Sequence, residues 1–283
     1  METFAGGKKV VHLNLDETCV RLWPGNAPGW IAWSASPAKR ILLTHAPLKL
    51  RRGCLSYVCA VADDPEVQLA LPQLVYGNPH VLPAAVHAAF QQPADHGVTL
   101  VRARSSWLNA ASLARVIRLI GKALAPFRDT HHVILTLDSA STHRHPRVLR
   151  AACSAQLFVC YVGPHMTPHM QPCDTHVFAQ FKRHLTSCYE TSRLSTRSES
   201  LDRTSFLRIL CESIDQVVRR RDWRSAFEHT GLDGKQSRLS RSLLTRLGLS
   251  ASPIVPSSLL TLRQLQSLHP ARIQVQIRLL FAL

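Results

Sequence analysis

The sequence predicts an α/β protein in which a mixed β-sheet is flanked by helices. Two observations predict this class. Apolar runs of strand length come first along the chain, and strands then alternate with amphipathic helices. Hydrophobic residues make up 46% of the 283 residues and charged residues 18%, which is the balance of a folded globular chain rather than a disordered one.

The first part of the chain has the pattern of a strand meander. Residues 9–16 combine β-branched and Leu residues and end in a turn-prone Asp-Glu-Thr. Similar apolar runs cover 40–44 and 55–61, and a further extended piece is expected at 67–71. No helix is expected before about residue 82.

The second part alternates helices with buried strands. Apolar residues recur every three or four positions in 108–124, which predicts an amphipathic helix. The elements expected after it are a strand at 133–138, a helix at 146–155, a strand at 157–162, and helices at 174–189, 205–220 and 223–229.

That order of elements matches the ribonuclease H-like fold. We expect residues 1–190 to form the main domain and 191–248 to be a helical C-terminal part of the same domain. Residues 249–283 are expected to be a tail of uncertain order.

Charge favours a polyanionic partner. The chain has 34 Lys plus Arg against 18 Asp plus Glu, a net charge of +16. Basic side chains that neutralise phosphates release condensed counterions, so this excess is typical of nucleic-acid binding, although a coding bias toward Arg would also produce it. No apolar stretch approaches the roughly 18 to 20 residues of a membrane helix. We therefore expect no membrane partner.

Three aspartates stand at the ends of recognisable local motifs. Asp16 follows an apolar run, Asp138 ends another, and Asp174 follows a proline-rich segment. Three carboxylates of this kind can hold two divalent cations for phosphoryl transfer on nucleic acid. Each aspartate alone is equally consistent with a helix cap or a turn cap, most of all Asp174, which stands where a helix is expected to begin.

Around these aspartates the chain resembles the DDE superfamily endonucleases, in particular the mariner/pogo-type transposases and their host-adopted relatives. The resemblance spans about residues 10–232. It is carried by Asn14-x-Asp16-Glu17-Thr18, Asp138 to His143, and Pro164 to Asp174, and more weakly by 105–109 and 223–231. Ser139 departs from the family's usual Asn.

The resemblance implies a metal-dependent nuclease site. Asp16 and Asp138 would share one Mg²⁺ ion and Asp174 would help hold a second, with Mn²⁺ as a substitute. Water would be the attacking group in strand nicking, or a 3′ hydroxyl in strand transfer. It further implies site-lining roles for Asn14, Glu17, His143 and Gln171, and contacts with the DNA backbone from Arg144, Arg147, Arg150 and Lys182. Trp107 and Trp223 are expected in the core rather than as platforms for bases.

The first functional hypothesis is therefore a DDE-type transposase or endonuclease catalytic domain acting on DNA in the nucleus, with no small-molecule cofactor. Only 15 residues precede Asp16, so we expect this chain to lack the N-terminal helix-turn-helix module of such transposases. The alternative is a domesticated, catalytically silent domain that binds DNA or protein, located in the cytoplasm if it is a non-functional fragment. A ribonuclease H-like nuclease acting on RNA or a hybrid, and a homodimeric state, both stay open.

Overall fold

The computed structural model describes residues 7–22, 30–32, 42–44, 53–90, 97–163, 165–196 and 200–233, together with positions 240, 243 and 245. The tail expected at 249–283 lies outside the described residues.

A six-stranded mixed sheet forms the centre of the molecule, in the order β6-β5-β4-β1-β7-β8. β1 runs antiparallel to β4 and parallel to β7, and the two edge pairs, β5–β6 and β7–β8, are parallel. The strands are β1 (Lys9–Arg21), β4 (Cys54–Ala62), β5 (Gln73–Gly77), β6 (Val98–Arg102), β7 (His131–Leu137) and β8 (Leu157–Tyr161). A separate two-stranded ribbon joins β2 (Trp30–Ala32) and β3 (Leu42–Thr44).

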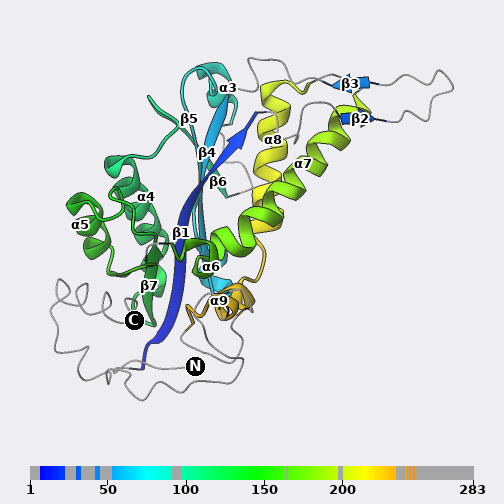
Figure 1. Ribbon diagram of the computed structural model, residues 1–283. Helices are drawn as coiled ribbons and strands as arrows, with labels where there is room; N and C mark the ends of the chain where they lie inside the picture. The colour runs from blue at the N-terminus through cyan, green and yellow to red at the C-terminus, as the bar shows by residue number, and fades with distance from the viewer. Residues whose placement is uncertain are drawn as a thin grey trace.

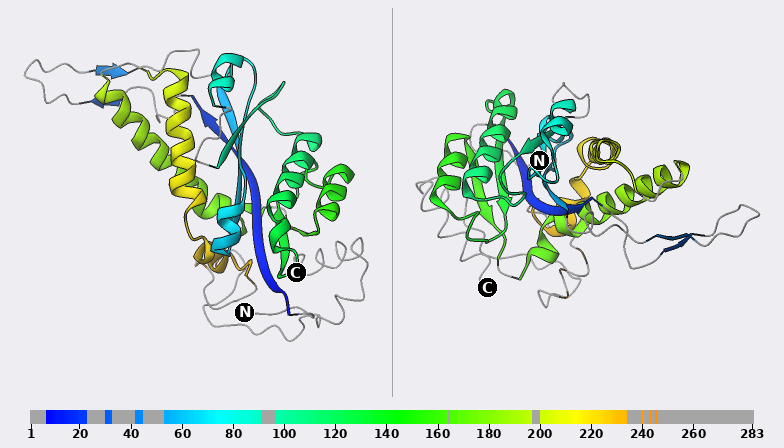
Figure 2. Two further views of the ribbon diagram at one scale, coloured as in Figure 1. Left: turned by 180° about the vertical axis from the view of Figure 1, so that it is seen from behind. Right: turned by 90° about the horizontal axis from the view of Figure 1, so that it is seen from above.

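Helices cover both faces of this sheet (Figures 1 and 2). One layer contains α4 (Ala110–Ala123) and α5 (Pro146–Ser154), and the opposite layer contains α7 (Phe178–Ser195) and α8 (Arg203–Ile214). The short elements are α2 (Pro65–Ala70), α3 (Ala84–Ala89), η1 (Ala125–Phe127), α6 (Thr167–Met170), η2 (Cys173–Val177), η3 (Asp215–Arg219) and α9 (Arg224–Thr230).

The central strand β1 serves both layers because successive side chains of a strand point to opposite faces. Leu13 and Leu15 are buried in the core beneath α4 and α5, whereas Val20 and Leu22 are buried in the core beneath α7 and α8. One strand of alternating residues therefore holds the two hydrophobic cores together. The side chain of Asn14, which points away from Leu13 and Leu15, is completely buried.

The predicted mixed sheet with flanking helices is confirmed, and so is the alternation of helix and strand from α4 to α7. Asn109 starts α4 by accepting hydrogen bonds from the amides of Ala111 and Ser112, both at 3.0 Å. Pro146 begins α5, as a helix tolerates proline in its first turn. Gly231 ends α9 with a φ of 72°, a left-handed conformation that suits glycine.

The expected strand at 67–71 is wrong, because those residues belong mainly to helix α2. Asp64 caps this helix by accepting hydrogen bonds from the amides of Glu66 (2.9 Å) and Val67 (3.0 Å), and Pro65 occupies its first turn. A cap outweighs the weak strand pattern of so short an apolar run. Strands β5 and β6 were not predicted.

The prediction for Trp107 is also wrong, since 62% of this side chain is exposed, whereas Trp223 is buried as expected. The neighbouring Ser106 turns inward instead. Its hydroxyl donates to the Cys54 carbonyl and accepts from the Asn78 amide, both at 3.1 Å.

Within the described ranges, no helix is both long enough and apolar enough to cross a membrane. All eight cysteines are free thiols.

Candidate active site

The register of two neighbouring strands places Asp16 and Asp138 side by side. β1 and β7 run parallel, with Asn14 opposite Thr136. Asp16 lies two residues beyond Asn14, and Asp138 lies two residues beyond Thr136, directly after the end of β7. Both carboxylates therefore stand at the same level of the sheet, on adjacent strands.

Asp174 reaches this point from outside the sheet. It lies in η2, a π-helical turn that follows the proline-rich crossing and leads into α7. The side-chain oxygen of Asn14 accepts a hydrogen bond from the Cys173 amide at 3.0 Å, which attaches the start of this turn to β1. π-helical turns inside helices are frequent at functional sites.

Gln171 connects two of the three carboxylate segments. Its side chain is completely buried. In the amide orientation that satisfies its neighbours, its nitrogen donates to Asp174 Oδ2 and its oxygen accepts from the Asp138 amide, both at 3.2 Å. The sequence-predicted residues Asn14, Gln171 and the three aspartates are thus brought together.

The three aspartates influence one another's ionisation. Burial raises the pKa of Asp16 to about 8, and the negative charges of Asp174 and Asp138 contribute to the rise. Burial and the charge of Asp138 also raise the pKa of Asp174, opposed by the positive charge of Lys182. A concentration of negative charge in a poorly solvated place is the environment in which a cation is most strongly stabilised.

Asp138 differs because it already has partners. Burial alone would raise its pKa, but an ion pair with His143 and a hydrogen bond from the Ala140 amide (2.8 Å) lower the pKa below its ordinary value. The same contact raises the pKa of His143 against the opposing effect of burial. The hydroxyl of Tyr161 donates to the His143 carbonyl at 3.1 Å and holds the loop in place. Nothing in the sequence singles out Tyr161.

Glu17 points to the other side of β1 from Asp16, toward the start of α4. Its carboxylate accepts a hydrogen bond from the Leu108 amide, and burial raises its pKa. One of its carboxylate oxygens, Oε2, is buried without a hydrogen-bond partner. Glu17 therefore lines the region between the carboxylates and the 105–109 loop.

Two of the predicted phosphate-binding residues lie near the carboxylates, since the charge of Arg144 lowers the pKa of Asp138 and the charge of Lys182 opposes the rise in the pKa of Asp174. Arg144, Arg147 and Arg150 are exposed, on the loop after Asp138 and on α5. Lys182 projects from α7, and its ammonium lies 5.8 Å from the centre of the Phe178 ring. Its positive charge partly offsets the negative charge at Asp174. Their cationic groups are available to a polyanion.

The donor chemistry fits a hard divalent cation, since magnesium prefers carboxylate oxygens and retains several waters. The ligand shell is not already assembled, however. Among the described residues, no three Asp, Glu, His or Cys side chains stand at metal-ligand spacing. His143 contacts Asp138 Oδ1, so one of the two oxygens of this carboxylate already has a partner.

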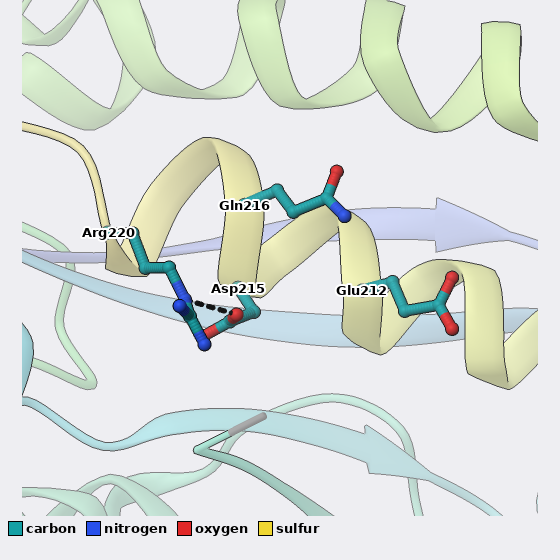
Figure 3. A pocket seen from close by; sticks show the side chains of 4 residues that line it. All are labelled: Glu212, Asp215, Gln216 and Arg220. Carbon is teal, nitrogen blue, oxygen red and sulfur yellow. Dashed lines mark hydrogen bonds and ion pairs between the residues drawn. The ribbon is translucent and has the colours of Figure 1, made fainter. Parts of the chain in front are cut away.

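A pocket on the α8 side of the molecule is lined by residues other than those of this site (Figure 3). Glu212, Asp215, Gln216 and Arg220 line it. Asp215 is paired with Arg220 at 2.6 Å and with Arg219 at 3.0 Å, so its charge is already neutralised. No predicted site residue lines this pocket.

Comparison with known proteins identifies the family. The family model described as DDE superfamily endonuclease matches residues 56–220, more than half of the chain. The chain belongs to the DDE superfamily endonucleases. The matched segment of this DDE domain includes Asp138 and Asp174 and begins after Asp16. No curated protein matches the chain.

Several solved structures are similar to this DDE domain. They include a Mos1 transposase paired-end complex with left transposon end (14% identity, TM-score 0.40, covering 78% of this chain and 55% of that one). Another is a Mos1 mariner paired end complex with Mn (16% identity, TM-score 0.39, covering 78% of this chain and 55% of that one). A third is the Mos1 strand transfer complex (14% identity, TM-score 0.44, covering 80% of this chain and 52% of that one). The chain spans about half the length of these structures.

Proposed function

We propose that this DDE domain cleaves or joins phosphodiester bonds of DNA in a reaction that depends on Mg²⁺ or Mn²⁺. The observation that carries the proposal is the convergence of Asp16, Asp138 and Asp174 from three separate elements, where burial, together with the charge of neighbouring aspartates, raises the pKa of Asp16 and Asp174. Family membership supports it. A DNA substrate would place the protein in the nucleus.

The residues of the site divide the work. Asp16 and Asp138 would hold one cation and Asp174 the second, and two such cations stabilise the attacking and leaving oxygens of an in-line displacement. His143 would release Asp138 Oδ1 when the cation binds, since both compete for that oxygen. The exposed cations Arg144, Arg147, Arg150 and Lys182 would bind the DNA backbone without reading its sequence.

A silent binding domain is the second candidate, and one observation favours it. Among the described residues the carboxylates are not at ligand spacing, and His143 already neutralises Asp138. A domain that binds DNA through its basic surface alone would need no further adjustment of this site.

The deciding experiment is nicking of supercoiled plasmid by the purified protein in Mg²⁺, in Mn²⁺ and in EDTA. Asp138→Asn and Asp174→Asn remove carboxylate charge at nearly constant volume, and Asp222→Asn, in an exposed pair with Arg224, is the matched control. We expect metal-dependent nicking that both site variants lose and the control retains. DNA binding without nicking by any of the proteins would establish the silent domain instead.

A further inference from the structure

The buried side chain of Asn14 makes hydrogen bonds to two different elements of the site. It lies on β1 and is completely buried. Its amide nitrogen donates to the Thr136 carbonyl of β7 at 3.1 Å, and its amide oxygen accepts from the Cys173 amide of η2 at 3.0 Å. One side chain therefore joins three elements that are far apart in the sequence.

Each of these contacts lies next to a proposed metal ligand. Asn14 is two residues before Asp16, Thr136 is two residues before Asp138, and Cys173 directly precedes Asp174. The ladder between β1 and β7 already sets Asp16 against Asp138. Asp174 lies outside that ladder, so its position depends on contacts such as the one between Asn14 and Cys173.

From this arrangement we infer that Asn14 is a positioning residue, which sets η2 at the height where Asp174 can hold the second cation beside the one held by the two sheet aspartates. The inference rests on the proposed function. Asn14 would not touch the metal or the DNA. It would act through the backbone on either side of the carboxylates, as the outer partners of metal ligands do.

The residue type suits this role. Asn supplies one donor and one acceptor in a short side chain, and both are used here. Asp would keep the bond from the Cys173 amide and lose the donor to Thr136. Leu has nearly the same size and would lose both, leaving the Cys173 amide buried without its partner.

A matched control separates positioning from general stability. Gln68 is also buried, donates to the Val218 carbonyl at 3.1 Å and accepts from the Ala62 amide at 2.7 Å. None of its partners adjoins a proposed metal ligand. Gln68→Met therefore removes an equivalent pair of hydrogen bonds elsewhere in the fold.

The experiment compares Asn14→Leu, Asn14→Asp, Gln68→Met and the natural protein by hydrogen exchange and by Mn²⁺ titration followed by electron paramagnetic resonance. We expect Asn14→Leu to speed exchange in 171–177 and to weaken Mn²⁺ binding by about tenfold or more, as loss of an outer partner of a metal ligand typically does. Asn14→Asp should keep 171–177 protected. Gln68→Met should change neither property, even where it lowers the melting temperature as much.

Plasmid nicking adds a third readout. Asn14→Leu should lower the maximal nicking rate while the DNA dissociation constant stays unchanged. Unaltered exchange in 171–177, or equal weakening of Mn²⁺ binding by Gln68→Met, would overturn the inference. If the natural protein binds no Mn²⁺, the proposed function fails, and the exchange data still decide whether Asn14 positions η2. Asn14→Ser replaces Asn14→Leu if the latter does not fold.

Discussion

At the scale of single residues, the molecule keeps an ionisable group where its charge is poorly stabilised. Burial and two neighbouring carboxylates raise the pKa of Asp16 to about 8. A structural aspartate would gain nothing from such an environment, whereas a metal ligand would regain its charge when a cation arrives. Without a cation, ionisation of Asp16 therefore lowers the free energy of unfolding of the protein.

Replacing Asp16 with Asn should stabilise the metal-free protein at alkaline pH. Between about pH 4 and pH 8 the folded state holds a proton that the unfolded state has released, so stability falls as pH rises through this window. Asn carries no such proton. Urea unfolding in EDTA should show a gain on the order of 2–5 kcal/mol at pH 8 that vanishes near pH 4. The same slope in both proteins would contradict the raised pKa.

Metal binding should release a proton. Because Asp16 is protonated below about pH 8, a cation must displace that proton before it can bind the carboxylate. Mn²⁺ affinity should therefore rise by about tenfold per pH unit between pH 6 and pH 7.5 when a single proton is displaced. Calorimetry in buffers of different ionisation enthalpy would count the protons. Asp16→Asn should bind Mn²⁺ weakly and without this slope.

At the scale of elements, local patterns predicted α4 from its apolar period, β7 and β8 from their apolar runs, and α5 from Pro146 at its start, because these signals depend on near neighbours. It did not predict α2, where the Asp64 cap decides the structure. Nor did it predict how closely helices approach. Gly121 of α4 lies against the end of α5, where a Cβ on it would stand 2.4 Å from the Ala155 Cβ.

Gly121→Ala should therefore destabilise the protein, although helix preference alone favours Ala by roughly 1 kcal/mol. The added methyl group would also be 3.2 Å from the Ala155 Cα, so α4 and α5 must separate. We expect a net loss of about 1–3 kcal/mol in urea unfolding, as for overpacked cores. Adding Ala155→Gly should recover part of the loss. An unchanged unfolding midpoint in the single variant would show that the two helices are not in contact.

At the scale of the whole molecule, the net charge of +16 predicts attraction to DNA but does not say which surface binds it. The fold locates the candidates, since Arg144 lies on the loop after Asp138 and Arg147 in the first turn of α5, whereas other exposed cations, such as Arg203 and Arg208, lie on α8. Equal losses of charge at the two places therefore distinguish a defined binding surface from general attraction.

We expect Arg144→Gln with Arg147→Gln to weaken binding to duplex DNA more than Arg203→Gln with Arg208→Gln. Each lost phosphate contact lowers the dependence of log K on log salt concentration by about 0.9, so the first pair should reduce that slope by nearly two. Fluorescence anisotropy across a salt series measures it. Equal effects of the two pairs would favour diffuse electrostatic binding.

The sequence by itself determined the chemistry available to this protein: three aspartates in matched motifs, a basic surface, and the helices and strands that their local periods predict. Only the tertiary structure decided that Asp16 and Asp138 stand on adjacent parallel strands and that η2 brings Asp174 to them. The physical reason lies in contacts between segments far apart in the sequence, namely the ladder between β1 and β7 and the hydrogen bond from the Cys173 amide to Asn14. They join segments that meet only when the chain has packed, and no local pattern of residues contains that information.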